Sequence, residues 1–122
     1  MAKFIYYNRN PSQDKTNDCV TRAISLVSGL PYGETMDKLY YTSRVFGCDM
    51  LDRACYRNYV EKILGGEPIF CRGLTVGELA DENPVGKYLV RVKGHLTAII
   101  NSKIYDEWDC REEFCDLAWF IP

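Results

Sequence analysis

The segment 87–108 most constrains the fold, because it contains successive runs of β-branched and aromatic residues separated by short polar turns. Residues 87–92 and 95–100 have the composition and alternation expected of β-strands. Asn101-Ser102 is the expected two-residue turn, after which residues 103–108 return as a third strand. The C-terminal part of the chain is therefore predicted to form an antiparallel sheet.

The part of the chain before this sheet has helical periodicity instead. Apolar residues at i, i+3, i+4 and i+7 predict a helix over 19–28 that ends at Gly29, and these are Val20, Ala23, Ile24 and Val27. Further helices are predicted over 32–46, from about 52 to 64, and after a capping box at Thr75 to about 81. Flanking segments expected to be extended are 4–7 (strand or arm), 67–70 and 117–121. The predicted class is α+β, with N-terminal helices packed on a C-terminal antiparallel sheet.

Length and charge limit the possible functions. The chain has 122 residues, which predicts a single domain over 1–122. Its formal net charge is -2 and its basic residues are scattered, so we expect no nucleic-acid partner. No stretch approaches the length of a membrane span, so no membrane partner is expected either.

The six cysteines are expected to be mostly reduced. The short apolar run at the N-terminus is not followed by an apolar region of signal-peptide length, which predicts a cytoplasmic location. No Cys-x-x-Cys pair occurs, so we expect neither a structural zinc site nor another cofactor, with a Cys-rich metal site as a rival hypothesis. Five of the cysteines are interpreted as core or incidental thiols: Cys48, Cys55, Cys71, Cys110 and Cys115.

Cys19 differs from the other cysteines in its predicted position. Asn17 and Asp18 are both good N-cap residues, which places Cys19 in the first turn of the helix over 19–28. The helix N-terminus favours a thiolate, whereas the charge of Asp18 opposes it. A reactive Cys19 therefore needs a partner base.

His95 is the only histidine and the best candidate for that base. Pairing across the Asn101-Ser102 turn places Thr97 opposite Asp106 and makes Asp106 the diagonal neighbour of His95 on one face of the sheet. A carboxylate there can fix the tautomer of the imidazole. Asp109 is the weaker alternative, because it points to the other face unless the strand contains a bulge.

The order of these residues resembles that of the papain-like cysteine peptidases. In that superfamily a Cys begins the first helix, a His lies on a later strand, and an Asp or Asn lies on the next strand. The segments 17–24 (Asn-Asp-Cys-Val-Thr-Arg-Ala-Ile), 94–95 and 105–109 are most similar to small phage-borne proteins of this fold. The resemblance implies the papain-like fold and a catalytic triad of Cys19, His95 and Asp106.

The resemblance also implies an oxyanion hole. A Gln six residues before the nucleophile serves this purpose in the family, and Gln13 has that spacing from Cys19, with Asn17 as an alternative donor. The implied activity is that of a cysteine-dependent hydrolase, a thiol peptidase or isopeptidase, whose partner is a protein or peptide substrate such as a host protein. The alternative is a catalytically inactive binding module of the same fold, such as a phage protein that inhibits a host factor.

Overall fold

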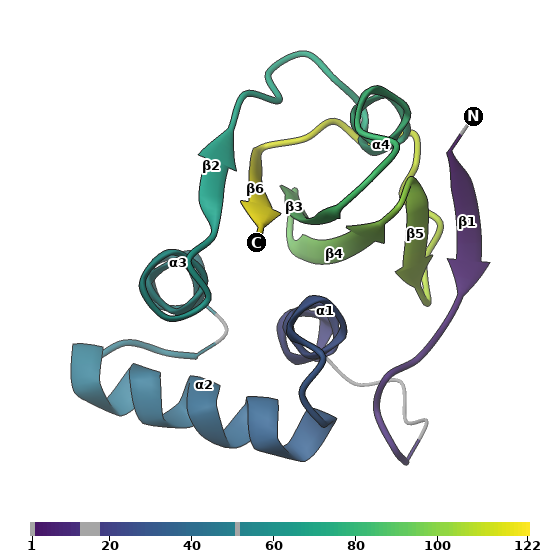
Figure 1. Ribbon diagram of the computed structural model, residues 1–122. Helices are drawn as coiled ribbons and strands as arrows, with labels where there is room; N and C mark the ends of the chain where they lie inside the picture. The colour runs from purple at the N-terminus through teal and green to yellow at the C-terminus, as the bar shows by residue number, and fades with distance from the viewer. Residues whose placement is uncertain (1, 13–17, 51) are drawn as a thin grey trace.

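A computed structural model describes residues 2–12, 18–50 and 52–122, and these form a mixed α+β structure (Figure 1). The helices are α1 (Cys19–Ser28), α2 (Tyr32–Phe46), α3 (Arg53–Asn58) with its π-helical continuation η1 (Tyr59–Ile63), and α4 (Val76–Glu82). The strands are β1 (Lys3–Tyr6), β2 (Glu67–Ile69), β3 (Lys87–Val92), β4 (His95–Ile100), β5 (Lys103–Asp106) and β6 (Leu117–Ile121). The predicted α+β class is confirmed.

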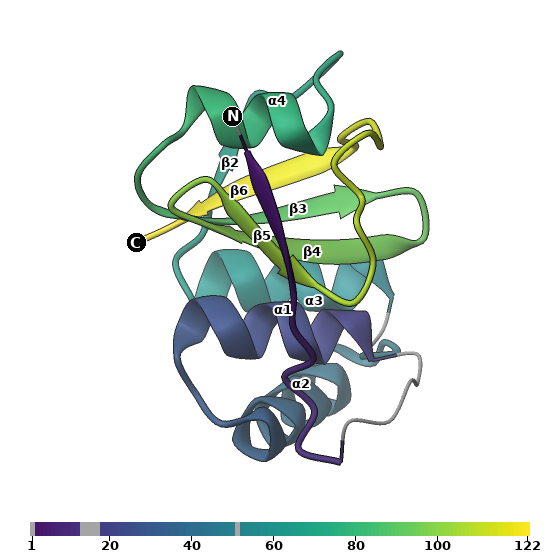
Figure 2. The ribbon, with the colours of Figure 1, turned by 90° about the vertical axis from the view of Figure 1, so that its right-hand side faces the viewer.

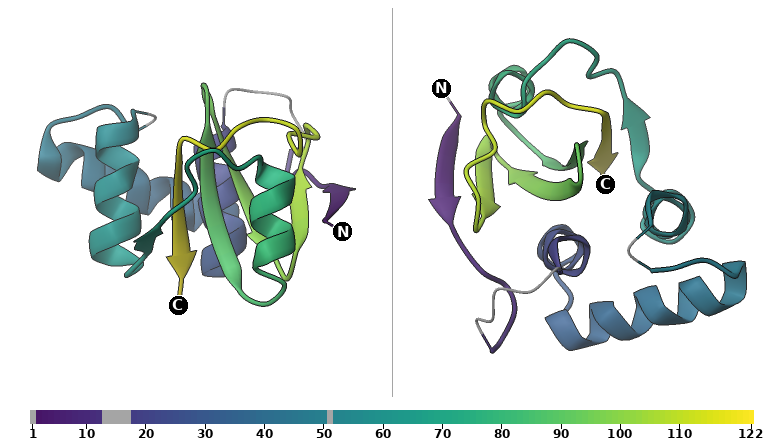
Figure 3. Two further views of the ribbon diagram at one scale, coloured as in Figure 1. Left: turned by 90° about the horizontal axis from the view of Figure 1, so that it is seen from above. Right: turned by 180° about the vertical axis from the view of Figure 1, so that it is seen from behind.

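One sheet contains all the described strands, in the order β1-β5-β4-β3-β6-β2. The β4–β5 hairpin has the predicted register, with Ile100 opposite Lys103. Asn101 and Ser102 both have positive φ, at 49° and 65°, as a two-residue hairpin turn requires. The sheet is not wholly antiparallel, because β1 pairs in parallel with β5 at one edge, as Figure 3 shows from behind.

Helices cover both faces of the sheet. Figure 2 shows α4 on one side, α1 and α3 on the other, and α2 beyond them. Each layer packs on its own apolar cluster. Ile24, Val27 and Leu96 belong to the cluster beneath α1, whereas Val76 and Leu79 belong to the cluster beneath α4. The first cluster fixes α1 against β4, and so fixes the end of α1 where Cys19 lies.

Three of the predicted helix boundaries have visible local causes. Gly29 and Gly47 end α1 and α2 with φ of 74° and 65°, the left-handed conformation that glycine adopts without a Cβ penalty. The capping box at Thr75 is confirmed, because its hydroxyl accepts from the Glu78 backbone N–H while the Glu78 carboxylate accepts from the Thr75 backbone N–H.

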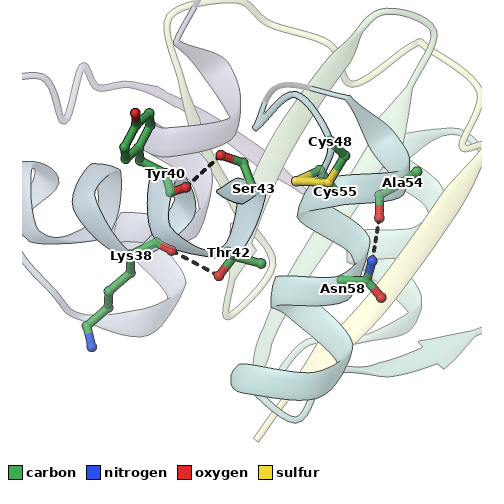
Figure 4. Close-up of a disulfide and its surroundings, with 8 residues drawn as sticks. All are labelled: Lys38, Tyr40, Thr42, Ser43, Cys48, Ala54, Cys55 and Asn58. Carbon is green, nitrogen blue, oxygen red and sulfur yellow. Dashed lines mark hydrogen bonds between the residues drawn. A yellow bond between two sulfur atoms is a disulfide. The ribbon is translucent and has the colours of Figure 1, made fainter. Parts of the chain in front are cut away.

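The interpretation of Cys48 and Cys55 as thiols is wrong. The two residues form a disulfide between the end of α2 and α3, with their Cα atoms 5.6 Å apart (Figure 4). The spacing of Cys48 and Cys55 did not indicate this pairing, because it matches no cysteine motif. The two residues meet because the chain after α2 places α3 beside Cys48. The other four cysteines, Cys19, Cys71, Cys110 and Cys115, are free in the structure.

Among the described residues, the helices are too short or too polar to cross a membrane.

Candidate active site

The structure brings Cys19, His95 and Asp106 together from three separate elements. Cys19 is the first residue of α1, His95 is the first residue of β4, and Asp106 is the last residue of β5. Each residue therefore lies at an end of a regular element, where its side chain can leave the packed layer. Gly94, with φ of 72°, makes the tight turn from β3 into β4 just before His95.

The His95–Asp106 pair matches the geometry predicted from the hairpin register. His95 Nε2 is 2.5 Å from Asp106 Oδ2, and the Asp106 side chain is only 3% exposed. An ionised carboxylate can only accept, so Nε2 carries the proton and Nδ1 is the nitrogen left for the thiol. Thr97, also on β4, donates its hydroxyl to the same Oδ2 at 2.7 Å.

The second oxygen of Asp106 is also satisfied. Oδ1 accepts from Arg22 Nη1 at 3.2 Å and from the backbone N–H of Glu107 at 2.7 Å. Burial alone would raise the pKa of Asp106, but hydrogen bonds from His95 and Thr97 and the charge of His95 outweigh burial and hold the pKa below its ordinary value. Asp106 is therefore a carboxylate with fixed donors on both oxygens.

Cys19 is a half-buried thiol whose pKa lies below its ordinary value. Burial by itself would raise the pKa of Cys19. Hydrogen bonds to His95 and to the backbone of Leu96, with the positive charges of His95 and Arg22, outweigh burial and lower the pKa instead. The thiolate is the nucleophilic form of cysteine, so these contacts favour reactivity.

The pKa of His95 changes in the opposite direction to that of Cys19. Burial would lower the pKa of His95, but hydrogen bonds to Asp106 and Cys19 and the negative charges of both raise it to about 9. Because the pKa of Cys19 is lowered and that of His95 is raised, the contact between them shifts the pair toward a thiolate and an imidazolium. This is the ionisation state that an activated cysteine nucleophile requires.

Arg22 joins the site to a buried polar network that sequence reasoning missed. Its Nε donates to Asp18 Oδ1 at 2.7 Å while its Nη1 donates to Asp106. Asp18 Oδ2 also accepts from the Tyr32 hydroxyl at 2.8 Å and from Asn10 Nδ2 at 3.1 Å. The spacing of Asp18 and Arg22, i and i+4, was the signal that could have indicated their pairing.

This network changes the expected role of Asp18. Asp18 is the N-cap residue, but its side chain makes no cap hydrogen bond within α1. Its charge is neutralised by Arg22, and the hydrogen bonds of Arg22, Tyr32 and Asn10 outweigh burial and lower the pKa of Asp18. Asp18 thus binds Arg22, whose charge adds to that of His95 in lowering the pKa of Cys19, and it is not an unpaired charge beside the thiolate.

The structure rejects one of the other candidate site residues and does not describe two more. Asp109 lies on the exposed surface and accepts from Arg111, so it does not orient His95. Gln13 and Asn17, the two candidate oxyanion donors, lie outside the described residues. The backbone N–H of Cys19 lies in the first turn of α1, where N–H groups have no intrahelical acceptor.

A pocket of about 140 Å³ opens beside Cys19 and His95. Sequence analysis did not identify its polar walls, because they come from α3 and β3. The residues that line it are Cys19, Val20, Arg53, Tyr56, Arg91, Gly94, His95 and Leu96. The rings of Trp108 and His95 pack in a T-shaped arrangement, with centroids 5.1 Å apart. A reacting group could therefore approach the sulfur from this pocket.

A metal ion would fit this site poorly. His95, Asp106 and Cys110 offer three potential ligand atoms within 4.8 Å of one another, a group that sequence spacing did not indicate. Two ligands of one tetrahedral zinc stand about 3.3 Å apart at Zn–N and Zn–O distances near 2 Å. The His95 Nε2 and Asp106 Oδ2 atoms are closer than this, at 2.5 Å, which is a hydrogen-bond distance. Burial also raises the pKa of Cys110 to about 12, so it is a thiol at neutral pH.

Comparison with protein-family models, curated proteins and solved structures found no significant match to this chain.

Proposed function

We propose that this protein is a cysteine-dependent hydrolase of the papain-like type, with Cys19 as nucleophile, His95 as acid–base and Asp106 as the residue that orients His95. The observation that carries the proposal is the contact of a thiol, whose pKa is lowered, with a histidine whose other nitrogen binds a buried carboxylate. Peptide or isopeptide bonds are the proposed substrates.

The proposed reaction proceeds in two steps. The Cys19 thiolate attacks the scissile carbonyl, forming a C–S bond, and the tetrahedral intermediate collapses as the C–N bond breaks. His95 Nδ1 gives its proton to the leaving amine. The neutral imidazole then takes a proton from water, whose oxygen attacks the thioester, and the C–S bond breaks to regenerate the thiolate.

Two further groups are proposed to stabilise the oxyanion. The backbone N–H of Cys19 is one donor, since it lies at the N-terminus of α1 where the helix dipole also favours negative charge. By resemblance to papain-like peptidases, the side-chain amide of Gln13 or Asn17 is the other.

Selective alkylation tests the proposed nucleophile and base. Iodoacetamide at pH 7 is expected to label Cys19 much faster than Cys71, Cys110 and Cys115, and His95→Ala is expected to abolish this difference. The labelling rate should rise with pH through the lowered pKa of Cys19 and change again near pH 9, where His95 loses its proton. If Cys19 reacts no faster than the other thiols in the folded protein, the proposal is wrong.

Turnover needs a separate measurement, because a reactive thiol is not by itself a hydrolase. With p-nitrophenyl acetate we expect a burst of one p-nitrophenolate per protein, followed by steady release as the acyl-enzyme is hydrolysed. Cys19→Ser should remove both phases. A burst without steady release would mean that the thiol is acylated but the acyl group is not hydrolysed, which would contradict the proposed hydrolase.

The second candidate is a binding module with an unused triad. Its supporting observation is a group of large apolar side chains exposed around α2 and η1, in which Tyr41 is 71% exposed. The other members are Tyr40, Val45, Phe46 and Ile63. Tyr40 points to solvent because the buried face of α2 contains Leu39 and Ser43 instead.

The two candidates differ in which substitution removes function. For the binding module, Tyr41→Glu should abolish association with a host protein while Cys19→Ser has no effect. For the hydrolase, Cys19→Ser should abolish turnover of p-nitrophenyl acetate while Tyr41→Glu leaves it unchanged.

A further inference from the structure

The walls of the pocket beside Cys19 have an unbalanced charge. Arg53 and Arg91 both line the pocket, and no Asp or Glu is among its lining residues in the described part of the chain. The carboxylate nearest to both arginines belongs to Asp116, which accepts from Arg91 Nη1 and lies 3.6 Å from Arg53 Nη1 through the same Oδ2 atom. Two guanidinium groups share one carboxylate, which leaves one positive charge at the pocket.

Asp116 also fixes where these arginines lie. Its backbone N–H donates to the Arg91 carbonyl at 2.7 Å, so the carboxylate and Arg91 are held at two points. Tyr56, from α3, lines the same pocket, and its interaction with Arg91 acts against the rise that burial causes in the pKa of Tyr56. The Arg91 side chain is 24% exposed and that of Arg53 is 52% exposed, so both remain open to a ligand while their positions are restrained.

Arginine suits a carboxylate better than other cations do, because its planar N–H donors match the two oxygens of that group. The pocket volume of about 140 Å³ is roughly ten times what one water requires, so a small anionic group fits beside the sulfur. Neither arginine belongs to the network that orients His95, in which Arg22 is the cation.

We infer that Arg53 and Arg91 form a subsite for a carboxylate next to the bond that Cys19 attacks, and that the substrate is acidic at this position. As a statement about substrate the inference rests on the proposed function. The carboxylate can come from an Asp or Glu side chain or from the C-terminus of a peptide, and both sources present the same planar anion to the two guanidinium groups.

Paired alkylating reagents test the subsite without a known substrate. Iodoacetate and iodoacetamide react identically, since the sulfur forms a bond to the methylene carbon as the C–I bond breaks and iodide leaves. They differ only in charge. We expect the ratio of the iodoacetate rate to the iodoacetamide rate at Cys19 to exceed that of glutathione by about tenfold, the lower end of electrostatic focusing. This excess should fall as salt is added.

Substitutions then assign the effect to the two arginines. Arg53→Gln and Arg91→Gln should each lower the ratio about threefold, and Arg91→Lys should retain part of it. Arg57→Gln is the matched control, because Arg57 lies one turn after Arg53 on α3 but binds Glu61 and lines a different cavity. An unchanged ratio in the folded Arg53→Gln protein, which alters a half-exposed side chain, would overturn the inference.

Longer reagents separate the two sources of the carboxylate. N-iodoacetyl-glutamate α-amide carries a side-chain carboxylate, whereas N-iodoacetyl-glycine carries a terminal one, and each has an uncharged amide counterpart. A charge preference in the first pair assigns an acidic side chain, and a preference in the second assigns a chain terminus. No preference in either pair overturns the inference.

The ratio is also independent of the absolute reactivity of Cys19. Slow labelling by both reagents with a high ratio would contradict the hydrolase and retain the anion subsite. Fast labelling by both with the ratio of glutathione would retain the hydrolase and contradict the subsite.

Discussion

Cys19 and Cys110 both belong to the surroundings of the His95–Asp106 pair, yet their chemistry is opposite. Cys19 is half-buried and hydrogen-bonded to His95, which lowers its pKa in spite of burial. Cys110 is 0% exposed, and burial together with the charge of Asp106 raises its pKa to about 12, although a hydrogen bond with Thr97 acts in the opposite direction. Positive charges lower the pKa of Cys19, whereas the charge of a carboxylate raises the pKa of Cys110.

The difference shows that closeness to a histidine and an aspartate does not by itself make a cysteine reactive. Reactivity depends on whether hydrogen bonds and positive charge offset the burial of the sulfur, and on whether water can reach it. Arg22 strengthens the contrast, because its charge lowers the pKa of Cys19 while it binds the Asp106 carboxylate.

Of the changes to the surroundings of these two thiols, removing Arg22 is expected to have the largest effect, and that effect is on the free energy of unfolding. Arg22→Met leaves the buried carboxylates of Asp18 and Asp106 without their shared cation, so the free energy of unfolding should fall by about 3 kcal/mol or more. Urea denaturation measures this loss. Arg44→Met, an exposed arginine at the end of α2, is the control and should change stability by less than about 0.5 kcal/mol. A loss below about 1 kcal/mol for Arg22→Met would contradict the network.

Asp106→Asn tests the orienting carboxylate directly. A hydrogen bond to a charged group contributes about 1.5–3 kcal/mol, so the rate of Cys19 alkylation at pH 7 should fall at least about tenfold. Site-resolved mass spectrometry after timed iodoacetamide treatment gives the rate, and Cys110 should remain unlabelled. Asp109→Asn should leave the rate within about twofold; an equal loss in both variants would exclude a specific role for Asp106.

Acid is expected to weaken the same network by a smaller amount. The folded-state pKa values of Asp18 and Asp106 lie below the ordinary value of 3.8, so the unfolded chain takes up protons first as the pH falls. Their contribution to stability is therefore complete above about pH 4 and is lost as pH falls through the lowered pKa values. Thermal denaturation between pH 5 and 2 should show this loss, with a shallower slope in Asp18→Asn. Equal slopes in both proteins would contradict the shifted carboxylates.

Cys110→Ala should have the smallest effect on reactivity. Loss of a small buried side chain should cost about 1 kcal/mol of stability, while Cys19 alkylation stays within about twofold. Added zinc should bind the two proteins equally weakly, since the His95–Asp106 distance suits a hydrogen bond rather than two metal ligands. Stoichiometric zinc that disappears in Cys110→Ala would instead establish the metal site and displace the triad.

The relation of His95 to Asp106 could be predicted from the sequence because it is local in a hairpin. A two-residue turn at Asn101-Ser102 fixes the register, and the period of two along each strand fixes the face. The helix of Cys19 could be predicted for a similar reason, since apolar spacing and Gly29 define its length. These features depend on neighbours a few residues apart.

The contacts that complete the site depend on tertiary packing. Arg22 reaches Asp106 across 84 positions in the chain, and Arg53 and Arg91 meet at Asp116 from α3 and β3. No periodicity or turn chemistry encodes such meetings, because they result from how the helices dock on the sheet.

Sequence alone thus determined the order of the elements, the hairpin register and the choice of Cys19 and His95 as a pair of interest. Tertiary structure decided that α1 docks with Cys19 against His95 and that Arg22 binds Asp106 and lowers the pKa of Cys19. It also decided that Arg53 and Arg91 line the pocket beside Cys19. The reason is physical: hydrogen-bonded turns and side-chain period act over a few residues, whereas burial and charge act between whichever groups packing brings together.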